Sequence, residues 1–303
     1  MNLPPHQYQV FGLNVASEVQ LSKLSNHSFD CADVIIKLAK VNINVPNGIK
    51  LGKFSQISSD DYLLDIPEVA KYYVQNGKTI TIEKNAGISD LLIQAYLFGT
   101  VFANILQYRG YLVLHGSAIK VDDRAIIFSG KSGAGKSTTA AAFIKRGYTL
   151  LTDDVVALSP NVDGTFSLVS GPPRLKLWQH AIDELGAATA EMVEVTNKMG
   201  KYEIPVTRAD NIGNIGVSAF YELNSHQADD IQLIRADDGV SKLRLLMKNT
   251  YRYKMLKPMN KLAEHLKFCT DFSKQINMFK VYRPENIFAI DELVASIENN
   301  LHS

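Results

Sequence analysis

Eight residues, Gly130 to Ser137, constrain this chain more than any other segment, because they satisfy the pattern G-x-x-x-x-G-K-[ST] at every fixed position. Glycines let the backbone curve closely around an anion, so that successive N–H groups point inward at phosphate oxygens. A helix that begins near Gly135 adds the positive end of its dipole. In this pattern Lys136 reaches the β- and γ-phosphates and the Ser137 hydroxyl reaches Mg²⁺, so the segment predicts nucleotide binding.

The residues on both sides of this loop fit the same interpretation. Apolar residues at 125–128 predict a strand that enters the loop, and residues 138–145 predict a helix that leaves it. Further strand-like runs lie at 111–121 and 149–159. Strand, loop, helix and strand in succession are typical of an α/β nucleotide-binding core. The residues expected to bind the nucleotide are Gly130, Ser132, Gly133, Ala134, Gly135, Lys136, Ser137 and Thr138.

Two acidic residues, Asp153 and Asp154, interrupt the apolar strand that follows the helix. Successive strand residues point to opposite faces, so both side chains cannot face a core comfortably. Their burial is costly unless Mg²⁺, Lys136 or a substrate hydroxyl compensates it; solvated aspartates at a bulge or strand end are the alternative. His115 lies in the preceding strand, where a single histidine is more often a hydrogen-bonded core residue than a catalyst.

The composition of the chain limits the classes of protein to which it can belong. The chain has 303 residues, 46% of them apolar, with a net charge of +1, as expected for a globular protein of one large or two smaller domains. This charge indicates neither a nucleic-acid partner nor an anionic membrane surface. Cys31 and Cys269 are too few and too far apart for a disulfide framework or an ordinary cysteine zinc site. No leader-like N-terminus and no long uninterrupted apolar run is present, so we expect a cytoplasmic protein without membrane contact.

The chain is predicted to divide after residue 90. Residues 1–90 contain many turn formers between short strand-like runs, which indicates a small mixed N-terminal module. Ser89 or Asp90 is a plausible N-cap for a helical stretch that opens the second part, residues 91–303. That part carries the nucleotide-binding loop and, from Ser241 onward, a mainly helical C-terminal region.

Several of these motifs together resemble the HPr serine kinase/phosphorylase family. His115-Gly116, the loop at 130–137, Arg146-Gly147 and Asp153-Asp154 follow in the order and spacing of that family's catalytic core. The strong resemblance covers about residues 111–180. Residues 11–21 and 171–178 are more similar to the divergent kinases that accompany peptide-maturation systems, including lasso-peptide kinases.

The resemblance implies a fold related to the P-loop core of phosphoenolpyruvate carboxykinase, and transfer of a phosphoryl group from ATP, with Mg²⁺, to a serine hydroxyl of a peptide or small protein. By position, Lys136 and His115 would belong to the catalytic set and Asp153 would be the general base. Ser137 and Asp154 would hold the metal, although the roles of the two aspartates could be exchanged. A carboxylate suits this chemistry, because the nucleophile needs mainly positioning and late deprotonation.

The sequence departs from the family in the segment 170–178, where a Glu-Ile-Arg-Gly-like motif would supply a metal-binding acid and this chain has none. Arg174 and Lys176 would share one face of an extended segment, where they could hold phosphate or an acidic substrate; a solvated basic pair is the alternative. Lys198 and Lys201 could do similar work. A small-molecule kinase, a regulatory nucleotide-binding module, a homo-oligomer and GTP in place of ATP all remain open at this stage.

Overall fold

The structure is a computed structural model that describes residues 3–22, 24–189, 192–195, 200–207 and 212–302. The chain forms two compact units. The first comprises Met1–Val113 with Tyr251–Lys267, and the second comprises Leu114–Thr250 with Phe268–Ser303. Each unit has its own sheet, and both combine strands with helices, so the predicted mixed α/β class is confirmed.

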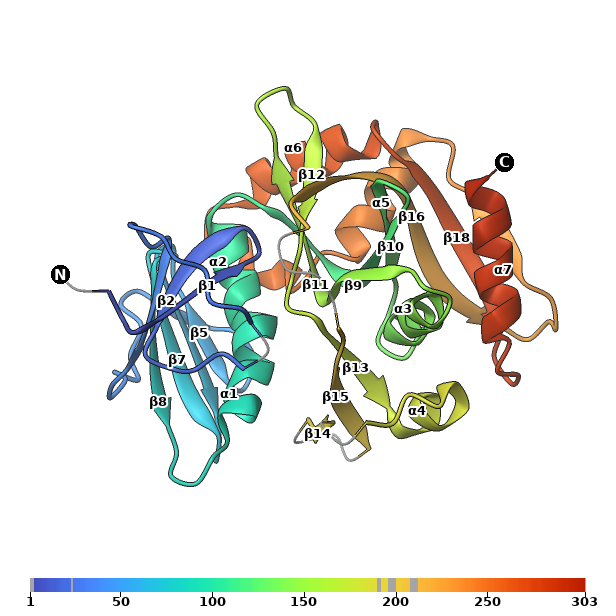
Figure 1. Cartoon of the computed structure of the whole chain (residues 1–303). Helices are drawn as coiled ribbons and strands as arrows, with labels where there is room; N and C mark the ends of the chain where they lie inside the picture. The colour runs from blue at the N-terminus through green and yellow to red at the C-terminus, as the bar shows by residue number, and fades with distance from the viewer. Residues whose placement is uncertain (1–2, 23, 190–191, 196–199, 208–211, 303) are drawn as a thin grey trace. The chain divides into compact units, whose positions relative to one another are not determined.

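The first unit is built on an eight-stranded sheet, drawn in blue to cyan in Figure 1. Its strands follow the order β1-β2-β3-β8-β7-β6-β5-β4. Its β2–β3 and β3–β8 pairs are parallel and the other pairs are antiparallel. Apolar and polar residues alternate along β7 and β8, so one face of these strands is buried. The strands are β1 His6–Val10, β2 Leu13–Ser17, β3 Val34–Leu38, β4 Ile49–Lys50, β5 Ser55–Ile57, β6 Asp61–Ile66, β7 Ala70–Gln75 and β8 Thr79–Lys84.

A helical stretch covers part of this sheet. It consists of α1 Asp90–Tyr96, the π-helical turn η1 Leu97–Val101 and α2 Phe102–Tyr108. The predicted N-cap is confirmed, since the Ser89 hydroxyl accepts a hydrogen bond from the Leu92 N–H. The stretch has 19 residues and is long and apolar enough to cross a membrane, but 83% of its most apolar window is buried inside the protein. That burial is typical of a core helix.

The sequence predicts a boundary after residue 90, whereas in the structure this helical stretch packs with the first unit. The Tyr72 hydroxyl donates to the Ile93 carbonyl at 3.0 Å, and the rings of Phe11 and Phe102 lie 5.8 Å apart. Residues 251–267, which include the short helix η2 Tyr253–Met255, also join this unit. The helix is apolar on most of its surface and therefore needs a sheet to cover it, which the preceding strands provide.

The second unit contains a seven-stranded sheet in the order β10-β9-β11-β12-β16-β18-β17. Because β10 also pairs with β16, the strands β9, β10, β11, β12 and β16 form a closed ring. The pairs β10–β16 and β16–β18 are parallel, so the carboxyl ends of these three strands share one edge. The strands are β9 Leu112–Val121, β10 Arg124–Ser129, β11 Thr149–Pro160, β12 Phe166–Val169, β16 Asn214–His226, β17 Gln232–Arg235 and β18 Asn277–Pro284.

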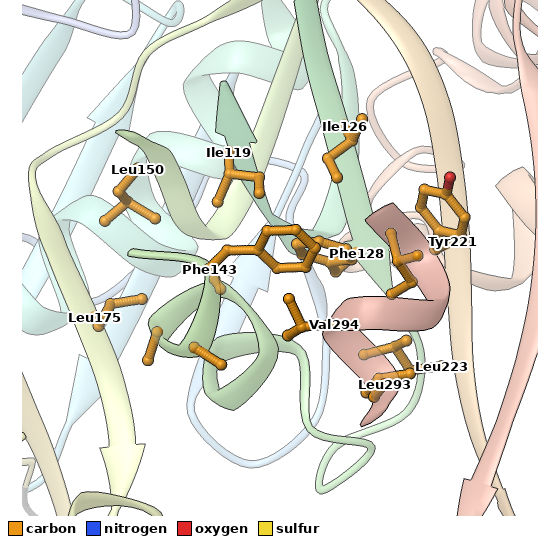
Figure 2. Close-up of a cluster of buried hydrophobic side chains, with 14 of the residues drawn as sticks. Ile119, Ile126, Phe128, Phe143, Leu150, Leu175, Tyr221, Leu223, Leu293 and Val294 are labelled. Atoms are coloured by element: carbon orange, nitrogen blue, oxygen red, sulfur yellow. The ribbon is translucent and has the colours of Figure 1, made fainter. Parts of the chain in front are cut away.

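Helices and a small sheet surround this ring. The predicted loop-following helix is α3 Lys136–Lys145, and the rings of Phe128 and Phe143 stack 5.3 Å apart in the core between α3 and β10 (Figure 2). α7 Ile290–Leu301 contributes Leu293 and Val294 to the same core. The other elements are β13 Arg174–Trp178, β14 Val193–Glu194 and β15 Lys201–Pro205, which form the small sheet, and the helices α4 Gln179–Leu185 and α5 Gly239–Lys248. The helix α6 Leu262–Ser273 begins in the first unit and ends in the second.

Candidate active site

The glycine-rich loop joins the end of β10 to the start of α3, as its pattern predicts. Gly130 has a φ of +138°, and a Cβ atom placed there would lie 2.5 Å from the Leu223 carbonyl oxygen, so only glycine fits. The Lys136 ammonium group donates to the carbonyls of Gly130 and Lys131 at 3.0 and 3.1 Å. Burial lowers the pKa of Lys136. The lysine therefore lies folded along the loop, where a phosphate would be its natural counter-charge.

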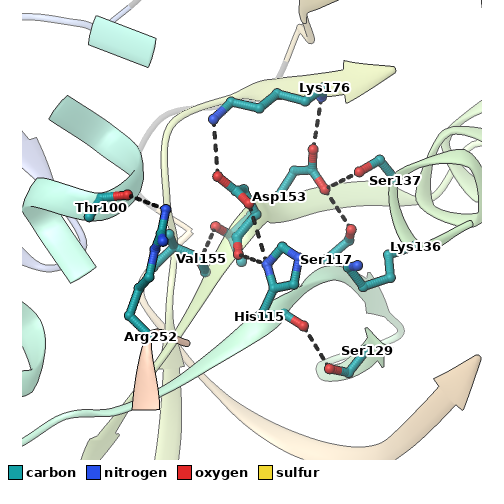
Figure 3. Close-up of polar contacts among 12 residues, drawn as sticks. Thr100, His115, Ser117, Ser129, Lys136, Ser137, Asp153, Val155, Lys176 and Arg252 are labelled. Atoms are coloured by element: carbon teal, nitrogen blue, oxygen red, sulfur yellow. Dashed lines mark hydrogen bonds and ion pairs between the residues drawn. The ribbon is translucent and has the colours of Figure 1, made fainter. Parts of the chain in front are cut away.

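Asp153 connects the loop to two neighbouring strands (Figure 3). Its Oδ1 accepts hydrogen bonds from the hydroxyls of Ser137 and Ser117 at 2.8 and 2.5 Å. Its Oδ2 accepts one from the backbone N–H of Lys176 at 2.8 Å. Ser137 is the hydroxyl residue at the end of the loop pattern, so this carboxylate lies directly beside the position where the pattern predicts a metal.

Asp154 breaks the regular geometry of β11, because its φ of +73° lies in the left-handed region. Side chains then no longer alternate between the two faces, and both carboxylates contact Lys176. The Lys176 ammonium group donates to Asp154 Oδ2 at 3.0 Å. The Thr152 hydroxyl donates to the Val155 carbonyl at 2.7 Å and supports the irregular turn. The two acids are therefore paired with other groups inside the protein and are not solvated at a strand end.

His115 lies on the other side of Asp154. Its Nδ1 is 3.0 Å from the Asp154 carbonyl oxygen and 3.4 Å from Asp154 Oδ1. Burial lowers the pKa of His115, so the ring is neutral at neutral pH. Burial also opposes ionisation of Asp154, but the charge and hydrogen bond of Lys176 and the further positive charge of Lys201 together outweigh it and hold the pKa of Asp154 well below its usual range. Asp154 is therefore a carboxylate with Lys176 as its ionic partner.

The residues that form this site lie in the segment of the chain that is similar to known proteins. Residues 107–176 match the HPr Serine kinase C-terminal domain, and this range contains the loop, His115, Ser117, both aspartates and Lys176. The matching part of this chain is HPr kinase-like. The chain is 36% identical over 87 residues to the HPr kinase/phosphorylase of Clostridium botulinum (strain Eklund 17B / Type B). It is 46% identical over 48 residues to the HPr kinase/phosphorylase of Treponema pallidum (strain Nichols).

These similarities cover limited parts of the proteins. The Clostridium match spans 29% of this chain and 26% of its relative, and the Treponema match spans 16% and 15%. The structure of the Hpr(Ser) kinase/phosphatase from Coxiella burnetii aligns over 63% of this chain and 95% of its own, with 14% identity and a TM-score of 0.30. The predicted family resemblance is confirmed for the HPr kinase-like segment, while the similarity to lasso-peptide kinases stays a prediction.

Arg174 and Lys176 share one face of β13, as their spacing predicts, and each side chain is only 11% exposed. Arg174 forms an ion pair with Glu203 on β15 at 2.7 Å, whereas Lys176 turns to Asp154. Arg174 is therefore neutralised within the small sheet, and Lys176 belongs to the acidic pair. Lys201 lies with its ammonium group 5.7 Å from the centre of the Trp178 ring, and Lys198 falls outside the described residues.

Strand β9 contributes residues that the motif alone does not reveal. Ser117 lies two positions after His115 and therefore points to the same face of the strand, which is a signal that the alternation rule could have used. The His115 N–H donates to the Asn249 carbonyl at 2.8 Å, and the Ser129 hydroxyl donates to the His115 carbonyl at 2.6 Å. A Cβ atom on Gly116 would lie 2.5 Å from the Phe128 carbonyl oxygen, so glycine is required where β9 and β10 approach.

The site has the oxygen ligands that a magnesium–nucleotide complex needs. Among the described residues no group of three or more His, Cys, Asp or Glu side chains is arranged to hold a metal by itself. Mg²⁺ with a nucleotide usually takes one or two protein oxygens, with phosphate oxygens and waters as its other ligands. Ser137 Oγ and Asp153 Oδ1 are 2.8 Å apart and fit that requirement.

Proposed function

We propose that this chain is an ATP-dependent kinase that transfers the γ-phosphoryl group to a serine hydroxyl of a peptide or small protein. The observation that carries the proposal is the contact between Asp153 and Ser137, which brings the acidic pair to the phosphate-binding loop. A loop for the triphosphate, oxygen ligands for Mg²⁺ and an adjacent carboxylate are the parts that phosphoryl transfer requires. The names of the HPr kinase/phosphorylase relatives support this reaction class and a P-loop core of the same type.

The contacts favour an exchange of the two aspartate roles expected from sequence position. Ser137 bonds to Asp153, so Asp153 and Ser137 would hold Mg²⁺, which would neutralise charge on the phosphates when bound. Asp154 has no hydrogen bond to Ser137 in the described structure and lies between Lys176 and His115. It is therefore the better placed carboxylate to accept the proton of an incoming hydroxyl.

A strongly ionised carboxylate such as Asp154 is a weak base, and this suits a kinase. The transition state of phosphoryl transfer is loose, so the hydroxyl loses its proton late and needs positioning more than activation. Neutral His115 would orient Asp154 through the contact of its Nδ1 with the Asp154 backbone. Lys176 would bring positive charge beside the transferring group, while Arg174 would stabilise β13 through Glu203.

The test uses the full chain with Mg²⁺-ATP and serine-containing candidate peptides. Transfer should add the mass of one phosphate to a peptide. Lys136→Ala should weaken ATP binding at least about tenfold, because the lysine is the point charge of the loop. Asp154→Asn should leave ATP binding within about twofold and lower the transfer rate by about 10²- to 10⁴-fold.

Asp123→Asn is the matched control, since this aspartate is 98% exposed on the β9–β10 turn and should change neither quantity. Unchanged turnover in Asp154→Asn would show that this residue is not the base. Transfer to a metabolite hydroxyl, with no transfer to any peptide, would replace the proposal by a small-molecule kinase. ATP binding without any transfer would indicate a regulatory module.

A further inference from the structure

An arginine from a distant part of the chain contacts the phosphate-binding loop. Arg283, near the end of β18, donates from Nε to the Ala134 carbonyl at 3.3 Å. A Cβ atom placed on Gly135 would lie 3.6 Å from the same Nε and 3.9 Å from Nη2 of Arg283. The guanidinium group therefore lies directly beside the Ala134–Gly135 turn, where the loop passes into α3.

The charge of Arg283 lacks an acidic partner within the described part of the chain. Its hydrogen bonds go to two backbone carbonyls, those of Ala134 and Pro284. The guanidinium is always protonated in proteins, and a partly buried charge is stable only when an opposite charge or a full set of hydrogen bonds compensates it. Carbonyl oxygens satisfy two of the donors but do not supply the counter-charge. The loop beside Arg283 is itself built to hold an anion, which would supply that charge.

The order of the strands decides which end of a nucleotide Arg283 would meet. β10, which leads into the loop, has β9 on one side and β16 on the other, and β18 follows β16 (Figure 1). The acidic pair lies on β11, next to β9, so it approaches the loop from the side opposite to Arg283. Because Ser137 contacts Asp153, the reacting γ-phosphate belongs on the β11 side. The other end of the phosphate chain must then extend toward β18.

We propose that Arg283 binds the α-phosphate of the nucleotide, with the ribose and base beyond it along the edge formed by β16 and β18. This inference rests on the proposed function, since it takes the loop to hold a nucleotide triphosphate. The carboxyl ends of the parallel strands β10, β16 and β18 share one edge, and the phosphate-binding loop follows the carboxyl end of β10, so a nucleotide held by the loop would lie along that edge. Arginine suits the role, because its planar group can donate to the loop and to phosphate oxygens together.

Three ligands separate this role from a purely structural one: Mg²⁺-ATP, Mg²⁺-tripolyphosphate and Mg²⁺-pyrophosphate. Their dissociation constants would be measured by calorimetry on the full chain and on Arg283→Gln. We expect the substitution to weaken ATP and tripolyphosphate by about tenfold each, because both have a third phosphate beside Arg283. Pyrophosphate fills only the inner positions and should change by less than about twofold. Arg283→Lys keeps the charge but loses the fork geometry, so it should fall between the wild type and Arg283→Gln.

Arg235→Gln provides the matched control, because Arg235 lies on β17, is 58% exposed and pairs with Asp237. It should bind all three ligands like the wild type. An equal loss for all three ligands in Arg283→Gln would show that Arg283 only supports the loop and would overturn the proposal. A loss confined to ATP would assign Arg283 to the nucleoside, and no loss would remove it from the site. If Lys136→Ala left ATP binding intact, the proposed function itself would fail, whereas a loss there with normal Arg283→Gln would reject only this inference.

Discussion

Strands β7 and β8 of the first unit differ from strand β11 of the second unit in the pattern of buried side chains along the strand. Buried and less buried residues alternate along β7 and along β8 up to Glu83, and the inward residues include Tyr72 and Ile80. In β11 there is no such alternation: consecutive buried residues stand before and after Asp153 and Asp154, which are both less buried, and Asp154 takes a left-handed conformation. The regular strands complete a core, whereas the irregular strand presents two carboxylates to polar partners. A local exception that neighbouring groups compensate is a marker of a functional site.

The regular core of the first unit should be very sensitive to the removal of a buried side chain. Phe102 is fully buried and its ring lies 5.8 Å from Phe11 and 5.7 Å from Phe98. Phe102→Ala should lower the free energy of unfolding by about 4 kcal/mol, because it leaves a cavity in the core. Denaturant unfolding followed by circular dichroism would measure it.

Phe54→Ala is the control for this prediction, because Phe54 is 40% exposed in the same unit and its loss should lower the free energy of unfolding by less than about 1 kcal/mol. The folded fraction of Phe102→Ala should still bind Mg²⁺-ATP like the wild type. A large loss of ATP affinity in that folded fraction would contradict the division of roles between the two units.

A somewhat smaller effect is expected from pH in the first unit. Burial lowers the pKa of His265 from 6.5 to about 4. The unfolded chain therefore binds this proton more readily, so the free energy of unfolding should decrease as the pH falls from about 6.5 to about 4, by about 3 kcal/mol in total. Unfolding curves at several pH values would show the decrease, and His265→Gln should remove most of it. His180, which is 71% exposed, gives the control His180→Gln; equal pH dependence in both variants would contradict the assignment.

The smallest effect concerns the second unit and should change rate with little change in binding. The Ser117 hydroxyl donates to Asp153 at 2.5 Å, so Ser117→Ala removes one of the hydrogen bonds that position this carboxylate. We expect a decrease in the transfer rate of about tenfold, ATP binding within about twofold and a stability loss near 1 kcal/mol. Steady-state kinetics would separate the rate from the binding. Ser218→Ala, which removes a 3.2 Å bond to the Ala125 carbonyl, should leave the rate unchanged; an equal loss in both variants would indicate a general effect on the sheet.

Much of the second unit follows from local signals. The glycine-rich pattern, the apolar run before it and the alanine-rich run after it predict β10 and α3, and the structure has both. These elements depend on short-range rules of backbone freedom and apolar spacing, which a single sequence contains. The first unit was harder to predict, because its eight strands include very short ones such as Ile49–Lys50 and its sheet order joins β3 to β8. No local pattern specifies such a pairing between distant strands.

The position of residues 251–267 is another feature that local sequence patterns do not specify. Their sequence predicts helical structure but not the core that they cover. In the structure they join the first unit, where the Gln107 amide in α2 donates to the Tyr251 carbonyl at 2.6 Å. Arg283 is a second example, because an arginine near a strand end usually points to solvent. Its contact with Ala134 depends on the pairing of β18 with β16 and of β16 with β10.

The order of the residues is enough to predict the phosphate-binding loop, the acidic pair that follows it and the similarity to HPr kinases, because these features depend on short segments of the chain. The folded structure was needed to show which aspartate contacts Ser137, how Lys176 pairs with Asp154 and which arginine lies beside the loop. These contacts join separate strands, and a single left-handed residue at position 154 changes where a carboxylate points. Whether these contacts form depends on strand register and on packing across the whole sheet, which no local rule specifies.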